Sequence, residues 1–285
     1  MILHDDDFLS NAVRNNGLDI ACPSEVRDWI ASNAPAQGHQ PSTFLDIGGN
    51  IGACALRAAA KGFVVIAVEP SSPNYLRLAT SSLISTFPET TAVFVVPAGA
   101  GSTTEIARVM ISLGNKGQNG VVPHSVSQDE LNKIASRTGA DHHGAIDKSA
   151  NTEECCIARI DDIVSGIRNQ FSQLPPVRYL KMDIEGFEEL ALAGAYDTLR
   201  GSIERITLEV SPGKLLGNNQ RPENLWGLIH GAGFRVLAGV LCTERPGFPC
   251  PRQSDWDSQG AWTRFLQPYM VISAEDEQWD MAWTK

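Results

Sequence analysis

The chain has 285 residues, 42% of them hydrophobic, which is enough to bury a full hydrophobic core. Its formal net charge of -10 argues against a general nucleic-acid binder, because such a protein needs a basic face to displace phosphate counterions. No apolar run approaches the roughly 20 residues that a membrane-spanning helix needs, so a membrane is not an expected partner either. From the length and the apolar content of the chain, we expect one enlarged domain rather than two.

Residues 1–41 are predicted to form a helical entry region, followed by the main domain at 42–285. A short helix is expected at about 24–33, because Pro35 and Pro41 interrupt regular structure after it. The first residues are acidic where a secretory signal would be basic, so we expect the protein in the cytoplasm.

The main domain opens with a predicted buried strand and a glycine-rich turn. Phe44, Leu45 and Ile47 form the nearly continuous apolar run that is typical of a parallel strand covered on both faces. Glycines at positions 48, 49 and 52 let the backbone turn tightly and approach a ligand, and a helix follows from about residue 50. Open α/β sheets bind ligands at this edge, so the candidate cofactor-binding residues are Asp46, Gly48, Asn50 and Gly52.

The next strand is predicted at 63–68, and Glu69 stands at its carboxyl end. Glu69 follows Gly48 by 21 residues, about the spacing at which an acidic residue binds ribose hydroxyls in nucleotide-binding βαβ units. Its carboxylate offers two acceptor oxygens to the two hydroxyls of a ribose. Glu69 is therefore a further candidate cofactor-binding residue.

The glycine spacing also indicates which nucleotide is bound. A dinucleotide fingerprint that starts at Gly48 needs glycines where the chain has Asn50 and Ala53, so the pyrophosphate pattern is incomplete. Asp46 would repel a pyrophosphate, but its charge suits the ammonium and the sulfonium of S-adenosylmethionine. No phosphate-binding NTPase loop occurs in the sequence. The loop therefore favours S-adenosylmethionine over NAD.

A helix is expected after residue 72, with Leu76, Ala79 and Leu83 as its inward stripe, and then a third strand at 92–96. Residues 114–154 are polar and rich in glycine, and we predict an insertion of the main domain there. A connection of this length in a compact domain is either functional or disordered. The two interpretations are a lid over the acceptor pocket and a surface insertion.

The segment 179–188 carries the candidate catalytic residues, at the end of a fourth strand predicted at 177–182. Alternation along an extended segment places Lys181, Asp183 and Glu185 on one side. Asp183 is the first candidate for a base that takes the proton of a hydroxyl, and Glu185 is the second. Lys181 would keep a carboxylate ionised or orient the acceptor. The alternative is an ion-paired strand end that braces the following helix.

Three more strands are predicted at 203–210, 234–237 and near 269–272, with a helix at 223–230. Cysteines lie at positions 22, 54, 155, 156, 242 and 250 without the spacing of a zinc site, and no metal site is predicted. In the cytoplasm the thiols should be mostly reduced, although a bridge between Cys242 and Cys250 remains an alternative.

Four of these segments together resemble the FkbM-type S-adenosylmethionine-dependent methyltransferases. The segments are Asp46–Gly52, Val68–Pro70, Arg159–Ile163 and Leu180–Glu188, and the Lys-x-Asp-x-Glu-Gly-x-Glu motif of the last is the most specific. The resemblance implies a Rossmann-like sheet of strand order 3-2-1-4-5-7-6 with an antiparallel last strand. It also implies O-methylation of a hydroxyl on a small molecule or sugar.

Two other classes of function stay open at this point. An NAD-dependent small-molecule oxidoreductase would share the sheet, and a catalytically silent S-adenosylmethionine-binding module would share the loop and Glu69. RNA is a minor alternative as the methyl acceptor because of the acidic net charge. The sequence leaves the oligomeric state open.

Overall fold

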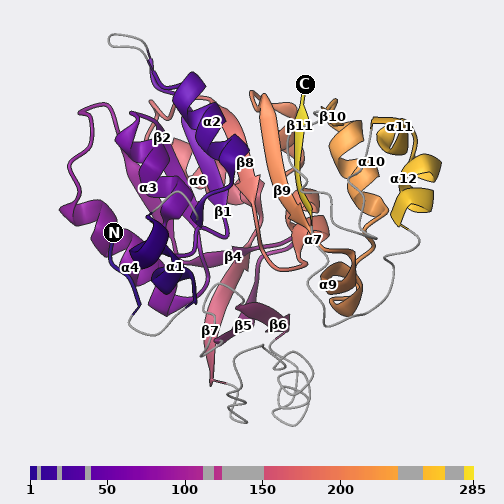
Figure 1. Cartoon of the computed structure of the whole chain (residues 1–285), viewed down its shortest axis with the longest axis horizontal. Coiled ribbons are helices and arrows are strands. Elements are labelled where there is room, and N and C mark those ends of the chain that lie inside the picture. The colour runs from indigo at the N-terminus through magenta and orange to yellow at the C-terminus, as the bar shows by residue number, and fades with distance from the viewer. Residues whose placement is uncertain are drawn as a thin grey trace.

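The computed structural model describes residues 1–4, 8–17, 21–35, 40–111, 119–123, 151–236, 253–266 and 279–285. In this part of the chain there is a seven-stranded sheet, covered by helices, and a four-stranded sheet that projects from one edge of it (Figure 1). Among these residues no helix combines the length and the apolar character that are needed to cross a bilayer.

The larger sheet is mostly parallel. Its strands are β1 (Thr43–Ile47), β2 (Val64–Val68), β3 (Val93–Val96), β8 (Val177–Met182), β9 (Arg205–Val210), β10 (Arg235–Val236) and β11 (Trp279–Thr284). They lie in the order β10-β11-β9-β8-β1-β2-β3, and β11 runs antiparallel to both of its neighbours. This is the strand order 3-2-1-4-5-7-6 when the strands of this sheet are numbered along the chain. The predicted Rossmann-like fold class is confirmed.

The position of the last strand was predicted wrongly. We expected it near 269–272, whereas β11 spans Trp279–Thr284 and pairs with β9 over all six of its residues. Met281, Ala282 and Trp283 are all buried, as expected for a strand that is covered on both faces of the sheet. Residues 267–278, with the expected strand, lie outside the described part of the chain.

Helices cover both faces of the larger sheet. On one face, Phe44, Val65 and Tyr179 pack against α2 and α3, with the rings of Trp29 and Tyr179 at a centroid distance of 4.5 Å. On the opposite face, Leu45, Ile66 and Leu180 belong to a second core. The helices are α1 (Phe8–Asn16), α2 (Ser24–Ser32), α3 (Ala53–Ala60), α4 (Ser72–Ile84), α6 (Ile160–Gln170), α7 (Glu188–Ala193), α8 (Tyr196–Arg200), α9 (Pro212–Gly217), α10 (Asn224–Gly231), α11 (Gln253–Trp256) and α12 (Gln259–Leu266).

The inward stripe of α4 also differs from the prediction. Leu76 and Leu83 are 56% and 84% exposed, and the buried residues of this helix are Asn74, Leu78 and Ser81. These three residues keep the spacing of one helical face, but two of them are polar. A search for an apolar stripe misses such a face. The inner side of α4 therefore has polar partners: Asn74 contacts Glu69 of the candidate site described below, and Ser81 accepts from the N–H of Ile2.

The smaller sheet was not predicted. It consists of β4 (Ala98–Ala100), β5 (Glu105–Ile111), β6 (Gly120–Pro123) and β7 (Asn151–Ala158), in the order β4-β7-β5-β6. Residues 120–123 and 151–154 of the polar segment thus belong to β6 and β7, while residues 112–118 and 124–150 lie outside the described part. The insertion stays a prediction, and both interpretations of it, a lid and a surface insertion, stay open.

A disulfide joins Cys22, just before α2, to Cys54 in the first turn of α3. This corrects the expectation that the thiols are reduced, although Cys155 and Cys156 are free. Sequence spacing does not indicate the pair, because the packing of α2 on α3 brings the two residues together. Disulfides persist mainly in oxidising compartments, so the bond counts against a cytoplasmic location. The location itself stays a prediction. Cys242 and Cys250 lie outside the described residues.

Candidate active site

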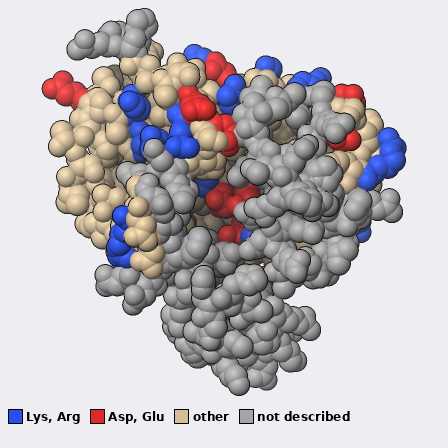
Figure 2. Space-filling view, viewed as in Figure 1, with Lys and Arg blue, Asp and Glu red and all other residues tan. Residues whose placement is uncertain are grey.

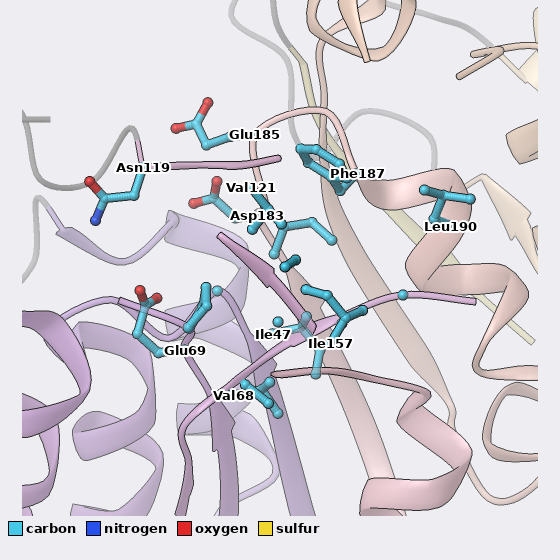
Figure 3. Close-up of a pocket in the computed structure, with 18 of the residues that line it drawn as sticks. Ile47, Val68, Glu69, Asn119, Val121, Ile157, Asp183, Glu185, Phe187 and Leu190 are labelled. Atoms are coloured by element: carbon cyan, nitrogen blue, oxygen red, sulfur yellow. The ribbon is translucent and has the colours of Figure 1, made fainter. Parts of the chain in front are cut away.

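A pocket opens where β1, β2 and β8 end, between the larger sheet and the smaller one. One part of its wall comes from the loop after β1 and from Glu69 after β2, and another from the segment after β8. The smaller sheet closes the pocket with apolar side chains that include Val121 and Ile157 (Figure 3). Asp and Glu side chains gather in a hollow near the middle of this face of the molecule (Figure 2).

The loop after β1 approaches its neighbours so closely that a side chain has no room. The backbone N–H groups of Gly48 and Gly49 donate to the carbonyl of Val68, at 2.9 and 3.0 Å. A Cβ atom on Gly48 would lie 1.8 Å from the carbonyl oxygen of Asp183, and the φ of Gly48 is +76°. Asn50 also has a positive φ, of 48°, which delays the start of α3 to Ala53. The loop therefore presents backbone to the pocket.

Glu69 is held in place by N–H donors on both of its oxygens. Oε2 accepts from the backbone N–H of Asn50 at 2.9 Å, and Oε1 accepts from that of Ser71 at 3.1 Å. The Nδ2 of Asn74 lies 3.5 Å from Oε1. Burial raises the pKa of Glu69 to about 7, although these donors oppose the shift. The carboxylate is thus oriented toward the pocket and keeps lone pairs for a ligand.

Lys181 and Asp46 lie behind the loop, and neither is among the described residues that line the pocket. The Nζ of Lys181 donates to the carbonyl of Gly48 at 2.9 Å and lies 3.4 Å from Asp46 and 3.5 Å from Asp183. Burial works against the charge of Lys181, but Asp46 and Asp183 outweigh it and raise the pKa of the lysine. Burial also raises the pKa of Asp46, against the effect of Lys181. The contacts of Lys181 with Gly48, Asp46 and Asp183 therefore hold β1 against β8 beneath the loop.

Asp183 and Glu185 both face the pocket. Asp183 continues β8, since its N–H donates to the carbonyl of Ile47 at 3.0 Å, and its side chain is 39% exposed. Glu185 has a φ of +59°, and its carboxylate is bound by the Nζ of Lys214. Figure 3 shows the two carboxylates turned toward the side of the pocket where Asn119 lies, with Phe187 and Leu190 opposite. The two predicted acids therefore both lie in the wall of the pocket.

The turn that carries Glu185 is fixed by residues from other parts of the chain. Gly186 has a φ of +90°, and a Cβ there would lie 2.7 Å from the backbone of Lys214. Its carbonyl accepts from Nε2 of Gln220 at 2.6 Å. Glu188 accepts the N–H groups of Ile184 and Gly186, each at 3.3 Å. The last acid of the motif therefore braces the turn rather than facing the pocket.

Glu188 gives a prediction about stability and pH. Burial raises its pKa to about 7, against 4.5 in the unfolded chain, and its Oε2 has no hydrogen-bond partner among the described residues. The folded state therefore holds a proton that the unfolded state loses, and this group makes stability fall as the pH rises from about 4.5 to 7. Glu188→Gln removes this dependence and should be more stable than the wild type at pH 8, by up to about 3 kcal/mol.

Urea unfolding at about pH 5 and pH 8 checks this expectation. The stability difference between Glu188→Gln and the wild type should grow from the lower to the higher pH. The matched control is Glu89→Gln, which changes an exposed carboxylate. Its difference in stability from the wild type should be the same at both pH values. Equal differences for Glu188→Gln at the two pH values would contradict the prediction.

Three carboxylates near the pocket could in principle hold a metal ion. Oxygens of Asp183, Glu185 and Glu209 lie within 4.8 Å of one another. The ammonium of Lys214 already contacts two of them, since it binds Glu185 and lies 3.6 Å from Glu209. A lysine in this position supplies the positive charge that a cation would bring. The arrangement therefore fits an ion-paired cluster.

Several residues of the site were missed in the sequence. Lys214 and Gln220 follow β9, whose carboxyl end lies at the same edge of the sheet, and this position was the available signal. Asn74 lies five residues after Glu69 on the inner face of α4, but a search for apolar positions passes over it. The predicted site residues Gly48, Asn50, Glu69, Asp183 and Glu185 all line one pocket.

The fold and the pocket together define a class of protein. A parallel sheet of this order, with a glycine loop after its first strand and a buried acid after its second, is a Rossmann-like domain of the nucleotide-binding type. The chain belongs to the FkbM methyltransferase family, because the family model described as Methyltransferase FkbM domain matches residues 46–236. The resemblance found in the sequence is confirmed.

Two solved structures that resemble this chain are methyltransferases. The FkbM methyltransferase of Methylobacillus flagellatus KT is 14% identical, with a TM-score of 0.43 over 98% of this chain and 61% of that one. The magnesium protoporphyrin IX methyltransferase ChlM of Synechocystis PCC 6803, solved with bound SAM, is 9% identical. Its TM-score is 0.42 over 99% of this chain and 86% of that one. This chain thus spans 61% of the length of the first of these proteins. None of the curated proteins matches the sequence.

Proposed function

We propose that this protein is an S-adenosylmethionine-dependent methyltransferase that methylates a hydroxyl oxygen of a small molecule or sugar. Family membership supports the reaction class. The observation that supports a ribose-bearing cofactor is Glu69, a buried carboxylate whose two oxygens are oriented by N–H donors at the end of β2. Two acceptor oxygens in this position suit a ribose diol. The incomplete dinucleotide glycine pattern of the loop favours S-adenosylmethionine over NAD.

The residues of the loop fit this cofactor as well. Gly48 and Asn50 bring the backbone to the pocket wall, and the steric limit at Gly48 keeps a side chain out of that space. Asp46 and Lys181 would act from behind the loop, as a pair that holds β1 against β8. Gly52 stands directly before α3 with a φ of +95° and would set the direction of that helix. When bound, S-adenosylmethionine supplies an electrophilic methyl group on a sulfonium.

The chain itself would contribute a base and the placement of the acceptor. An alcohol is a poor nucleophile, and a carboxylate within hydrogen-bond reach can take its proton as the new bond forms. Asp183 lines the pocket at the end of β8, and the ammonium of Lys181 lies 3.5 Å from its carboxylate. Glu185 is the second carboxylate at the same wall and is oriented by Lys214. The apolar side chains of Phe187, Val121 and Ile157 would exclude water from the acceptor.

Calorimetry with S-adenosylmethionine, its demethylated product S-adenosylhomocysteine and NAD tests the choice of cofactor. The first two should bind, and NAD should bind weakly or not at all, because the loop lacks the dinucleotide glycines. Tighter binding of NAD would support an oxidoreductase instead. A catalytically silent module would bind S-adenosylmethionine but transfer no labelled methyl group to any acceptor. We also propose a small-molecule or sugar acceptor as the partner and a cytoplasmic location.

Glu69 gives the sharpest test of the cofactor site. Glu69→Ala should weaken the binding of S-adenosylhomocysteine by about 1.5 to 3 kcal/mol, the range for hydrogen bonds to a charged group. Glu89→Ala is the matched control, because it removes an exposed carboxylate outside the pocket and should keep the wild-type affinity. The unfolding midpoints show whether each variant remains folded. An unchanged dissociation constant for Glu69→Ala would move the ribose contact to another residue.

A further inference from the structure

The first residues of the chain dock on α4, beside the proposed cofactor site. The backbone N–H of Ile2 donates to Oγ of Ser81 at 2.6 Å, and that of His4 donates to Oγ of Ser10 at 3.0 Å. A guanidinium N–H of Arg14 donates to the carbonyl of His4. His4 itself is 0% exposed. This amino-terminal segment is therefore anchored by specific contacts with α1 and α4.

A chain of side-chain hydrogen bonds runs from His4 to Glu69. The Nε2 of His4 lies 2.9 Å from Oδ1 of Asn74, and Nδ2 of the same asparagine lies 3.5 Å from Oε1 of Glu69. His4 and Asn74 are 0% and 1% exposed, so water does not compete for these contacts. Asn74 also lines the pocket together with Glu69. The chain thus connects the amino-terminal segment with the pocket wall.

The chemistry of the three groups fixes the direction of these bonds. In its ionised form the carboxylate of Glu69 only accepts hydrogen bonds, so the NH₂ end of the Asn74 amide then faces it. Its oxygen then faces His4, and Nε2 of His4 must carry the proton. If the histidine did not donate, the amide oxygen would lose this buried hydrogen bond, which favours the present orientation of the amide. His4 therefore holds the asparagine in the orientation in which it donates to Glu69.

We propose that His4 is a positioning residue of the cofactor site, which acts through Asn74 on the carboxylate of Glu69. The inference rests on the proposed function, since it needs Glu69 to bind the ribose. Without the third donor, the carboxylate keeps the N–H groups of Asn50 and Ser71 but gains freedom to move between them. The amino-terminal segment, outside the matched family domain of residues 46–236, thereby completes the site.

Calorimetry with S-adenosylhomocysteine and the full chain tests this role. His4→Leu, which removes the donor, should raise the dissociation constant about threefold to tenfold, the effect of one buried hydrogen bond. His4→Gln keeps an N–H at a similar reach and should stay within about twofold of the wild type. In an Asn74→Ala background, His4→Leu should have no further effect, because the connection to Glu69 is already broken.

The control for general docking of the segment is Ser81→Ala, which removes the acceptor of the Ile2 N–H without touching Asn74 or Glu69. This variant should lower the unfolding midpoint and leave the dissociation constant unchanged. If His4→Leu does not fold, His4→Asn, whose amide is too short to reach Asn74, provides the same comparison.

Wild-type affinity in His4→Leu, or equal losses in His4→Leu and Ser81→Ala, would overturn the positioning role. An additive effect of His4→Leu in the Asn74→Ala background would overturn it as well. Absence of binding by the wild type would instead overturn the proposed function. The two failures are therefore distinguishable.

Discussion

Asp183→Asn should lower the rate of methyl transfer by about a hundredfold to ten-thousandfold, the usual contribution of a positioned base. Asparagine keeps the size of the side chain but cannot accept the proton of a hydroxyl. The affinity for S-adenosylhomocysteine should change little, because Glu69 and the loop, not Asp183, are proposed to hold the cofactor. The rate is measured with labelled methyl donor and with the acceptor that labelling of a metabolite extract identifies.

The control for Asp183→Asn is Asp162→Asn, which changes an exposed aspartate of α6 that pairs with Arg159 and should keep the wild-type rate. A wild-type rate for Asp183→Asn would show that Asp183 is not the base, and the charges at the end of β8 would then be structural. If binding and turnover fall together, Asp183 is a cofactor or folding residue. Glu185 is then the next position to test.

Removal of the Cys22–Cys54 disulfide should destabilise the protein by about 3 to 4 kcal/mol, the chain-entropy effect of closing a loop of this length. The two cysteines are 32 residues apart and are 1% and 3% exposed. The double variant Cys22→Ala/Cys54→Ala is suitable, because it leaves no polar group in this core. Urea unfolding in oxidising buffer measures the difference in the free energy of unfolding between this variant and the wild type.

Two controls separate the bond from the loss of the sulfur atoms. Wild-type protein in a strong reductant should lose most of the same stability, whereas the double variant should not respond to reductant at all. Cys156→Ala, at an exposed free cysteine, should behave as the wild type in both buffers. Equal unfolding curves for the wild type and the double variant in oxidising buffer would refute the contribution of the disulfide.

The amino acid sequence by itself determined the parallel core of the sheet and the place of the site. Buried parallel strands appear in the sequence as continuous apolar runs. A turn that packs closely against the backbone of another segment requires glycine, as Gly48 does against Asp183. Both signals are local, so β1, β2, β8 and β9 could be predicted within a few residues. Since parallel strands end at one edge of the sheet, their order along the chain was enough to place Glu69, Asp183 and Glu185 in one pocket.

Only the tertiary structure decided which partners each of these residues has. Lys181 binds the carbonyl of Gly48 across 133 residues, and His4 binds Asn74 across 70. The disulfide between Cys22 and Cys54 depends likewise on the packing of α2 against α3. No periodic pattern encodes such pairs, because each joins two segments whose local signals concern only their own strand or helix. The polar inner face of α4 and the smaller sheet were missed for this reason.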